Sequence, residues 1–160
     1  KLCLVLVLVL LSCCEGPFSP LPTVEMLLSS PEQIEIEGRQ YVLETYLWRD
    51  FMPVSPPDGK PLIALIWITA VDLLPFPGAL DADRLWVVND QQFWETEFSD
   101  EERPADPNRK HQLEKIARDG PKWGPGIYVD VVVRIVYYKT AGHKKEYFLK
   151  ASRQLIGRTD

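Results

Sequence analysis

The sequence predicts an all-β fold, an antiparallel sandwich of two sheets with about seven to nine strands. Three observations support this class. Apolar and polar side chains alternate along several segments, which is the period of a strand. The 14 prolines and 9 glycines of the 160 residues lie mostly between these segments, where they favour turns. No segment has a convincing long helical period.

The N-terminus predicts export from the cytoplasm. Lys1 is followed by an unbroken apolar run over residues 2–11 and then by Ser12-Cys13-Cys14. A run of this length is too short to cross a bilayer as a helix, which takes roughly 20 residues, but it suits the core of a secretory signal peptide. A buried N-terminal strand is the alternative interpretation. We expect residues 1–12 to be the signal peptide.

The residues Leu10-Leu11-Ser12-Cys13 resemble the lipobox of bacterial lipoproteins, in which a small residue precedes the cysteine that receives the lipid. Leu11 departs from the usual pattern, since a small or hydroxyl residue is commoner there. The resemblance implies that acyl chains such as palmitate anchor the protein in the bacterial cell envelope, facing the periplasm or the exterior. Cys13 is favoured over Cys14 as the modified residue, because Ser12 is the better residue before the cut.

Residues 13–33 are predicted to form the lipidated N-terminus and a tether rich in proline and serine. Such a segment stays extended and lifts the following domain off the membrane. The sequence leaves open whether Val24–Leu28 is a helical turn or an edge strand. Residues 34–160 are assigned to the β-sandwich domain. Removal of Cys3 with the signal leaves one cysteine besides the lipidated one, so no disulfide framework is expected.

The first half of the domain reads as strands separated by proline-rich loops. Strands are expected at 33–37 and 40–50, where apolar residues recur at every second position. Five prolines and glycines make 53–61 a loop. Residues 62–71 are apolar at both alternating sets of positions, which predicts a strand in the middle of a sheet and covered on both faces.

The middle of the chain is punctuated by two loops, at 75–83 and 99–110, both expected to be exposed. Between them, 84–88 and 91–98 predict a hairpin that turns at Asn89-Asp90. Residues 112–118 fit both a short amphipathic helix and a strand, and the surrounding strands favour the strand.

The C-terminal third predicts a long antiparallel hairpin, with strands at 127–138 and 146–156. Alternate residues of the first strand are apolar and face inward. The outer positions Tyr128, Val132, Val136 and Tyr138 are more apolar than contact with water requires, so something is expected to cover them.

The strand pattern over residues 34–157, with its Trp-Gly-Pro-Gly turn before a valine-rich strand, resembles immunoglobulin-like or fibronectin type III-like domains of bacterial lipoproteins. The Cys-Trp-Cys core of antibody domains is absent. The resemblance therefore implies a fold and no activity.

Candidate catalytic and metal-binding groups are sparse. The two histidines, His111 and His143, lie in predicted polar loops and lack nearby ligand partners, so no transition-metal site is expected. Asp81 and Asp83 could bind calcium, but solvation on the surface is favoured because further ligands are missing. The sequence has no nucleophile elbow and no glycine-rich phosphate or dinucleotide loop, and it predicts no cofactor.

Binding is the function class that remains. The net charge of −5 argues against nucleic-acid binding. We expect a non-catalytic envelope lipoprotein that acts as a binding or structural module for a protein or glycan. The alternative is a carbohydrate-binding module that uses exposed tryptophans, with Trp86, Trp94 and Trp123 as candidate ligand-binding residues. The plainer interpretation is that these rings fill the core. An enzyme whose residues meet only in the folded chain is the third option.

Overall fold

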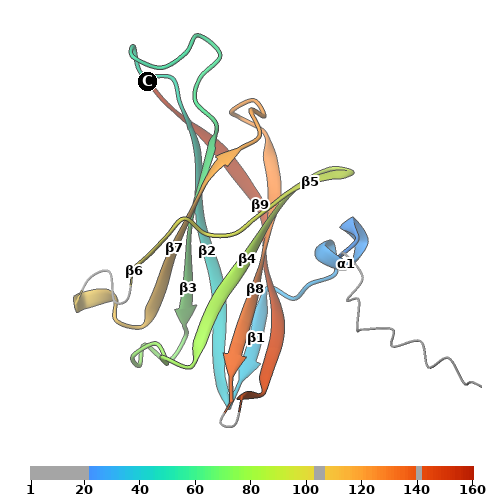
Figure 1. Ribbon diagram of the computed structural model, residues 1–160, viewed down its shortest axis with the longest axis vertical. Coiled ribbons are helices and arrows are strands. Elements are labelled where there is room, and N and C mark those ends of the chain that lie inside the picture. The colour runs from blue at the N-terminus through green and yellow to red at the C-terminus, as the bar shows by residue number, and fades with distance from the viewer. Residues whose placement is uncertain (1–21, 103–106, 140–141) are drawn as a thin grey trace, which may run out of the picture.

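The computed structural model describes residues 22–102, 107–139 and 142–160. The predicted signal peptide, Cys13 and Cys14 lie outside the described residues. The described part is built from strands, which confirms the all-β prediction (Figure 1). Its elements are α1 (Val24–Leu28), β1 (Gln33–Ile36), β2 (Arg39–Asp50), β3 (Leu62–Ala70), β4 (Leu80–Asn89), β5 (Gln92–Thr96), β6 (Asp100–Glu102), a 3₁₀ turn (Pro107–Arg109), β7 (Gln112–Gly120), β8 (Tyr128–Tyr138) and β9 (Lys144–Thr159).

The strands are hydrogen-bonded into one curled sheet with the order β5-β4-β8-β9-β2-β3-β7-β6, and β1 pairs with β2. The pairing is antiparallel except between β2 and β9, where Leu47 to Asp50 run parallel to Ile156 to Thr159. The prediction of purely antiparallel pairing is therefore wrong at this junction, and the sheet is mixed.

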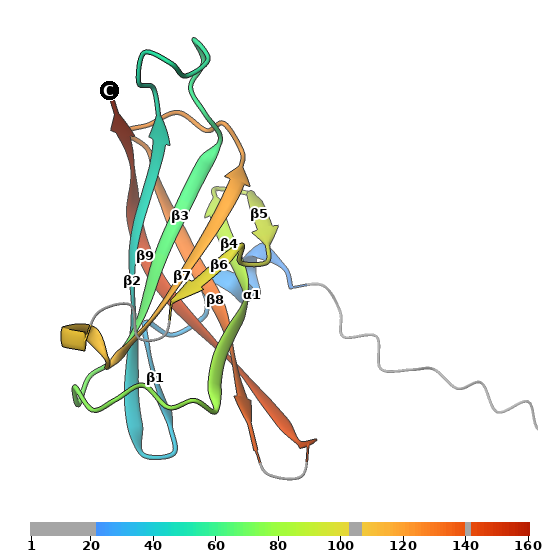
Figure 2. The same ribbon diagram turned by 60° about the vertical axis from the view of Figure 1, so that its left-hand side comes forward.

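The curl of the sheet is made by β9, which runs the length of the molecule (Figures 1 and 2). Its first part pairs with β8 and its last four residues pair with β2. Near the end of the part that pairs with β8, Arg153 has a φ of +54°, and its N–H donates to Asp130 Oδ1 at 3.0 Å. The pairing register of β8 shifts at the same place, between Val129 and Val131. A bulge of this kind bends a strand, so β9 serves both halves of the sheet.

One hydrophobic core lies inside the curl and takes side chains from both halves. The inward residues of the valine-rich strand are buried, as predicted, namely Val129, Val131, Val133 and Ile135. On β3 the inward set from Leu62 to Ala70 is fully buried, whereas the outward set is only half-buried. The middle position of β3 in the sheet is confirmed, but its predicted cover on both faces is wrong for the outer face.

The open edge of the curl closes through side chains. Lys115 is inward-facing on β7 and 6% exposed, and its Nζ lies 2.8 Å from Asp81 Oδ1 of β4. The indole of Trp94 on β5 packs against Gly120 at the end of β7. Strands β4 and β5 at one end of the strand order therefore contact β7, near the other end, through side chains.

The outer face of β8 is covered by α1, which contacts β4, β8 and β9. Leu27 of the helix joins Trp86, Val88 and Val132 in a second buried cluster. The predicted cover over the outer apolar positions of β8 is present at Val132 and Val136, which are buried, and is wrong for Tyr128 and Tyr138, which are exposed. The described part of the predicted tether, residues 22–33, packs on the domain.

Several segment boundaries differ from the predicted ones. β4 begins at Leu80, so the predicted loop at 75–83 is wrong for its last four residues. Within 99–110, residues 100–102 form a short strand that pairs with β7. The hairpin at Asn89-Asp90 is confirmed, with Asp90 at a φ of +54°, and 112–120 is a strand.

Candidate binding face

The three tryptophans chosen from the sequence lie in different surroundings. Trp86 is 2% exposed beneath α1 and presents no ring face to solvent. Trp94 is half-buried and packs against the main core from the opposite side of the β4–β5 pair. Trp123 is half-buried in the loop between β7 and β8 and also packs against the core. The fold does not gather them on one surface.

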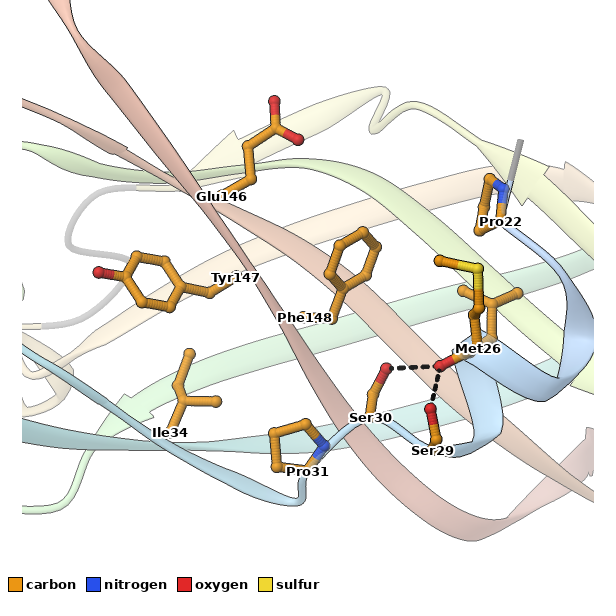
Figure 3. A pocket seen from close by; sticks show the side chains of 10 residues that line it. Pro22, Met26, Ser29, Ser30, Pro31, Ile34, Glu146, Tyr147 and Phe148 are labelled. Carbon is orange, nitrogen blue, oxygen red and sulfur yellow. Dashed lines mark hydrogen bonds between the residues drawn. The ribbon is translucent and has the colours of Figure 1, made fainter. Parts of the chain in front are cut away.

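An apolar groove of about 370 Å³ lies between α1 and β9 (Figure 3). Met26 and Phe148 line it, together with prolines and aliphatic side chains. The hydroxyls of Ser29 and Ser30 both donate to the Met26 carbonyl, at 2.8 and 3.4 Å, so their polar atoms are bonded to the backbone. The groove offers apolar contact and little directed polar recognition.

A broader feature is the outer face of the other half of the sheet, where β9, β2, β3 and β7 lie side by side (Figure 2). Tyr46 pairs with Leu65, and Leu65 pairs with Ile116. Leu155 lies beside Tyr46, since the following residues Leu47 and Ile156 are partners. Two residues further along β2, Trp48 pairs with Ile63. We call Tyr46, Trp48, Ile63, Leu65 and Leu155 the aromatic face.

The aromatic face remains accessible. Tyr46 and Leu155 are each 50% exposed, and Trp48 is half-buried. The rings of Tyr46 and Trp48 lie 5.2 Å apart between centroids and are tilted by 31°. The two rings form an adjacent pair on a rigid strand, because β2 is hydrogen-bonded on both sides.

A polar cavity of about 330 Å³ adjoins the aromatic face on the same side of the sheet. We define the polar cavity by its lining residues, which are Glu44, Trp67, Arg109, His111 and Gln112. Glu44 and Trp67 pair across β2 and β3, two residues along from the pair of Tyr46 and Leu65. Alternate residues of a strand share a face, so the cavity and the aromatic face form one surface.

Hydrogen bonds fix the side chains of the polar cavity. Glu44 Oε2 accepts from Thr69 Oγ1 at 2.8 Å and from Gln112 Nε2 at 3.1 Å. The indole N–H of Trp67 donates to Glu114 Oε2 at 2.5 Å. The guanidinium carbon of Arg109 lies 5.8 Å from the centroid of the Trp67 ring. The cavity therefore places a carboxylate, an amide and an aromatic ring in fixed positions.

Sequence reasoning missed these residues. Trp67 was assigned to a strand covered on both sides, and His111 to a solvated loop. One feature of the sequence could have indicated them. The outward-facing residues of β2 and β3 are largely apolar, whereas those of an ordinary exposed sheet are polar. That signal does not say whether another layer covers the face.

The acidic pair considered for calcium is engaged in ion pairs. Asp81 contacts Lys115, and Asp83 accepts two hydrogen bonds from Arg134, both at 2.8 Å. The hydrogen bonds that Arg134 donates to Asp83 raise the pKa of its guanidinium above the ordinary value. Within residues 22–102, 107–139 and 142–160 no group of three or more histidine, cysteine or acidic side chains is arranged to hold a metal ion.

Among the described residues, no helix has the length and apolar character needed to span a membrane. Comparison of the chain with protein-family models, with curated proteins and with solved structures finds no match.

Proposed function

We propose that this chain is an exported, membrane-tethered binding module without catalytic activity. The aromatic face and the adjoining polar cavity are its ligand-binding surface. The observation that carries the proposal is the partial exposure of Tyr46, Trp48 and Leu155 on one side of a rigid sheet. Contiguous exposed apolar side chains rimmed by polar groups are typical of interaction sites.

We also propose how the strands are arranged in layers. We infer an immunoglobulin-like sandwich in which β9 contributes to both layers. The shared core between the β4–β8 half and the β2–β3–β7 half supports this interpretation. In such a sandwich one outer face is covered by α1, and the other is free to bind.

The proposed anchor is a lipid on Cys13. The described residues begin at Pro22, nine positions after Cys13. Acyl chains on one cysteine contribute about 0.8 kcal/mol per buried methylene, so the domain needs no membrane affinity of its own. The binding surface would then act in the cell envelope.

Metabolic labelling with radioactive palmitate tests the anchor. We expect the wild-type chain and Cys14→Ala to be labelled and to sediment with membranes, and we expect Cys13→Ala to lose both properties. Cys14→Ala is the matched control, because it removes the neighbouring thiol. Labelling that persists in the double variant contradicts a cysteine-linked lipid.

A further inference from the structure

We infer that the ligand of this surface is a neutral saccharide chain, which stacks on Tyr46 and Trp48 and places hydroxyl groups in the polar cavity. The inference rests on the proposed function and names the ligand class for the same site. It differs from a site at Trp86, Trp94 or Trp123, none of which contributes to this surface.

The aromatic face supplies the apolar part of the recognition. The flat side of a sugar ring carries C–H groups, which pack on the face of an aromatic ring. Tyr46 is 50% exposed, and its ring is inclined by only 31° to that of Trp48. The two rings therefore present their faces in similar directions, unlike an edge-to-face pair.

The polar cavity supplies the hydroxyl recognition. A carboxylate accepts hydrogen bonds from neighbouring hydroxyl groups, and histidine and arginine add donors. Glu44 is held in place by Thr69 and Gln112, so its geometry is set before a ligand binds. The cavity of about 330 Å³ lies within the range of roughly 300–1,000 Å³ that is usual for small-ligand sites.

The length of the surface favours a chain over a single sugar. Trp48 and Glu44 are four residues apart on β2, which corresponds to about 13 Å along a strand. This distance is longer than one sugar ring. An oligosaccharide can therefore contact the aromatic face and the polar cavity at the same time.

Other ligand classes fit the surface less well. An extended peptide adds to the edge of a sheet, but β3 lies between β2 and β7, and β2 is paired with β3 on one side and with β1 and β9 at its two ends on the other. A charged ligand lacks a surface of one sign, because the carboxylates of Glu44 and Glu114 lie near the guanidinium of Arg109. A neutral, polyhydroxylated chain matches both the rings and the mixed polar groups.

The test is binding of the full chain, purified in detergent, to an array of neutral cello-, chito-, manno- and xylo-oligosaccharides, followed by calorimetric titration of the best binder. We expect Tyr46→Ala and Trp48→Ala each to weaken binding by about tenfold, the effect of one lost ring contact. Glu44→Gln should weaken it by a similar factor. Tyr138→Ala is the matched control, because Tyr138 is 53% exposed at the far end of β8.

Each contrary result has a distinct meaning. If no oligosaccharide binds while palmitate labelling of Cys13 is normal, the saccharide inference is overturned and the membrane-tethered module stands. If an oligosaccharide binds equally well to the Tyr46, Trp48 and Glu44 variants, the assigned surface is wrong. A dimer in sedimentation that Tyr46→Ala dissociates would replace the saccharide with a second copy of the chain. Thermal melts of each variant establish that it is folded.

Discussion

Arg49 shows how one buried side chain organises two loops. It is 3% exposed, and its guanidinium donates to four backbone carbonyls. The two loops are residues 51–61 and 121–127. Both lie at the end of the molecule that holds the C-terminus (Figure 1). The accepting carbonyls belong to Asp58, Lys60, Lys122 and Trp123. A planar fork of donors suits this task, because it bonds several acceptors in fixed directions.

Arg49→Met is expected to lower the free energy of unfolding by about 1.5–3 kcal/mol, the usual contribution of hydrogen bonds to a charged group. Arg49→Lys keeps the charge but loses the fork, and we expect it to recover only part of the loss. Urea denaturation measures both. The exposed Lys145→Met serves as a control and should change stability by less than about 0.5 kcal/mol. Equal urea midpoints for Arg49→Met and wild type would show that the hydrogen bonds from Arg49 to the two loops do not stabilise the fold.

Arg39 and Asp72 form a second clamp, and this one depends on pH. Arg39 Nε and Nη2 donate to the Asp72 carboxylate at 2.7 and 2.8 Å, and Nη2 also donates to the Leu74 carbonyl. The hydrogen bond from Arg39 lowers the pKa of Asp72 from 3.8 to about 2. The clamp holds a loop in which Leu73 has a φ of +59°, a conformation that leucine rarely adopts.

Because the pKa of Asp72 is lower in the folded chain, its stabilising effect is present above about pH 4 and is lost as the pH falls towards 2. We therefore expect wild type to be more stable than Asp72→Asn near neutral pH, and we expect the difference to shrink with acidification. Urea midpoints of both chains between about pH 6 and about pH 2 measure this. A difference that stays constant with pH would contradict the assignment.

At the scale of elements, β5 and β7 meet in a close contact between Trp94 and Gly120. A Cβ added at Gly120 would lie 2.7 Å from the Trp94 ring. We expect Gly120→Ala to destabilise the fold by about 1–3 kcal/mol through overpacking. Gly78→Ala is the control, since a Cβ there meets nothing within 4 Å. Thermal or urea unfolding measures the loss, and Trp94→Leu should relieve it. A cost that is unchanged in the Trp94→Leu background would contradict this cause.

Elements with strict alternation were predictable from the sequence, and elements with polar interruptions were not. β8 carries apolar residues at every second position, so its buried face and its length could be predicted. The start of β4 was missed because the prolines and glycine over 75–78 predicted a loop that reached residue 83. Asp81 and Asp83 instead lie in β4, paired with basic side chains. The parallel junction of β9 with β2 has no local signal, since periodicity does not encode the direction of the partner strand.

At the scale of the whole molecule, the binding surface depends on which layer covers which face. The sequence ranked Trp86 as a candidate because it lies in a predicted hairpin, but α1 covers it. Trp67 lies in a strand that was expected to be covered on both faces, yet the outer face that it shares with Trp48 has no such cover and stays half-buried. Tertiary packing decides these exposures, so alternation alone could not locate the site. Carbohydrate binding by Trp94 or Trp123 stays a prediction.

The same packing predicts where the folded domain begins. Leu27 is 1% exposed and completes the cluster around Trp86 and Val132, and the Lys150 N–H donates to the Pro31 carbonyl at 2.8 Å. A chain that starts at residue 22 should therefore be more stable than one that starts at residue 34, the domain boundary expected from the sequence. We expect a difference of about 2–5 kcal/mol, comparable to the loss of a large buried side chain.

Urea unfolding of the two truncated chains measures this difference, and two point variants separate its causes. Leu27→Ala in the longer chain should reproduce much of the loss, because it removes the helix contact but keeps the backbone. Met26→Ala is the matched control, since Met26 lies on the same helix and is 54% exposed. Equal stability of the two truncated chains would mean that α1 covers Trp86 and Val132 without stabilising the fold, and that residues 22–33 belong functionally to the tether.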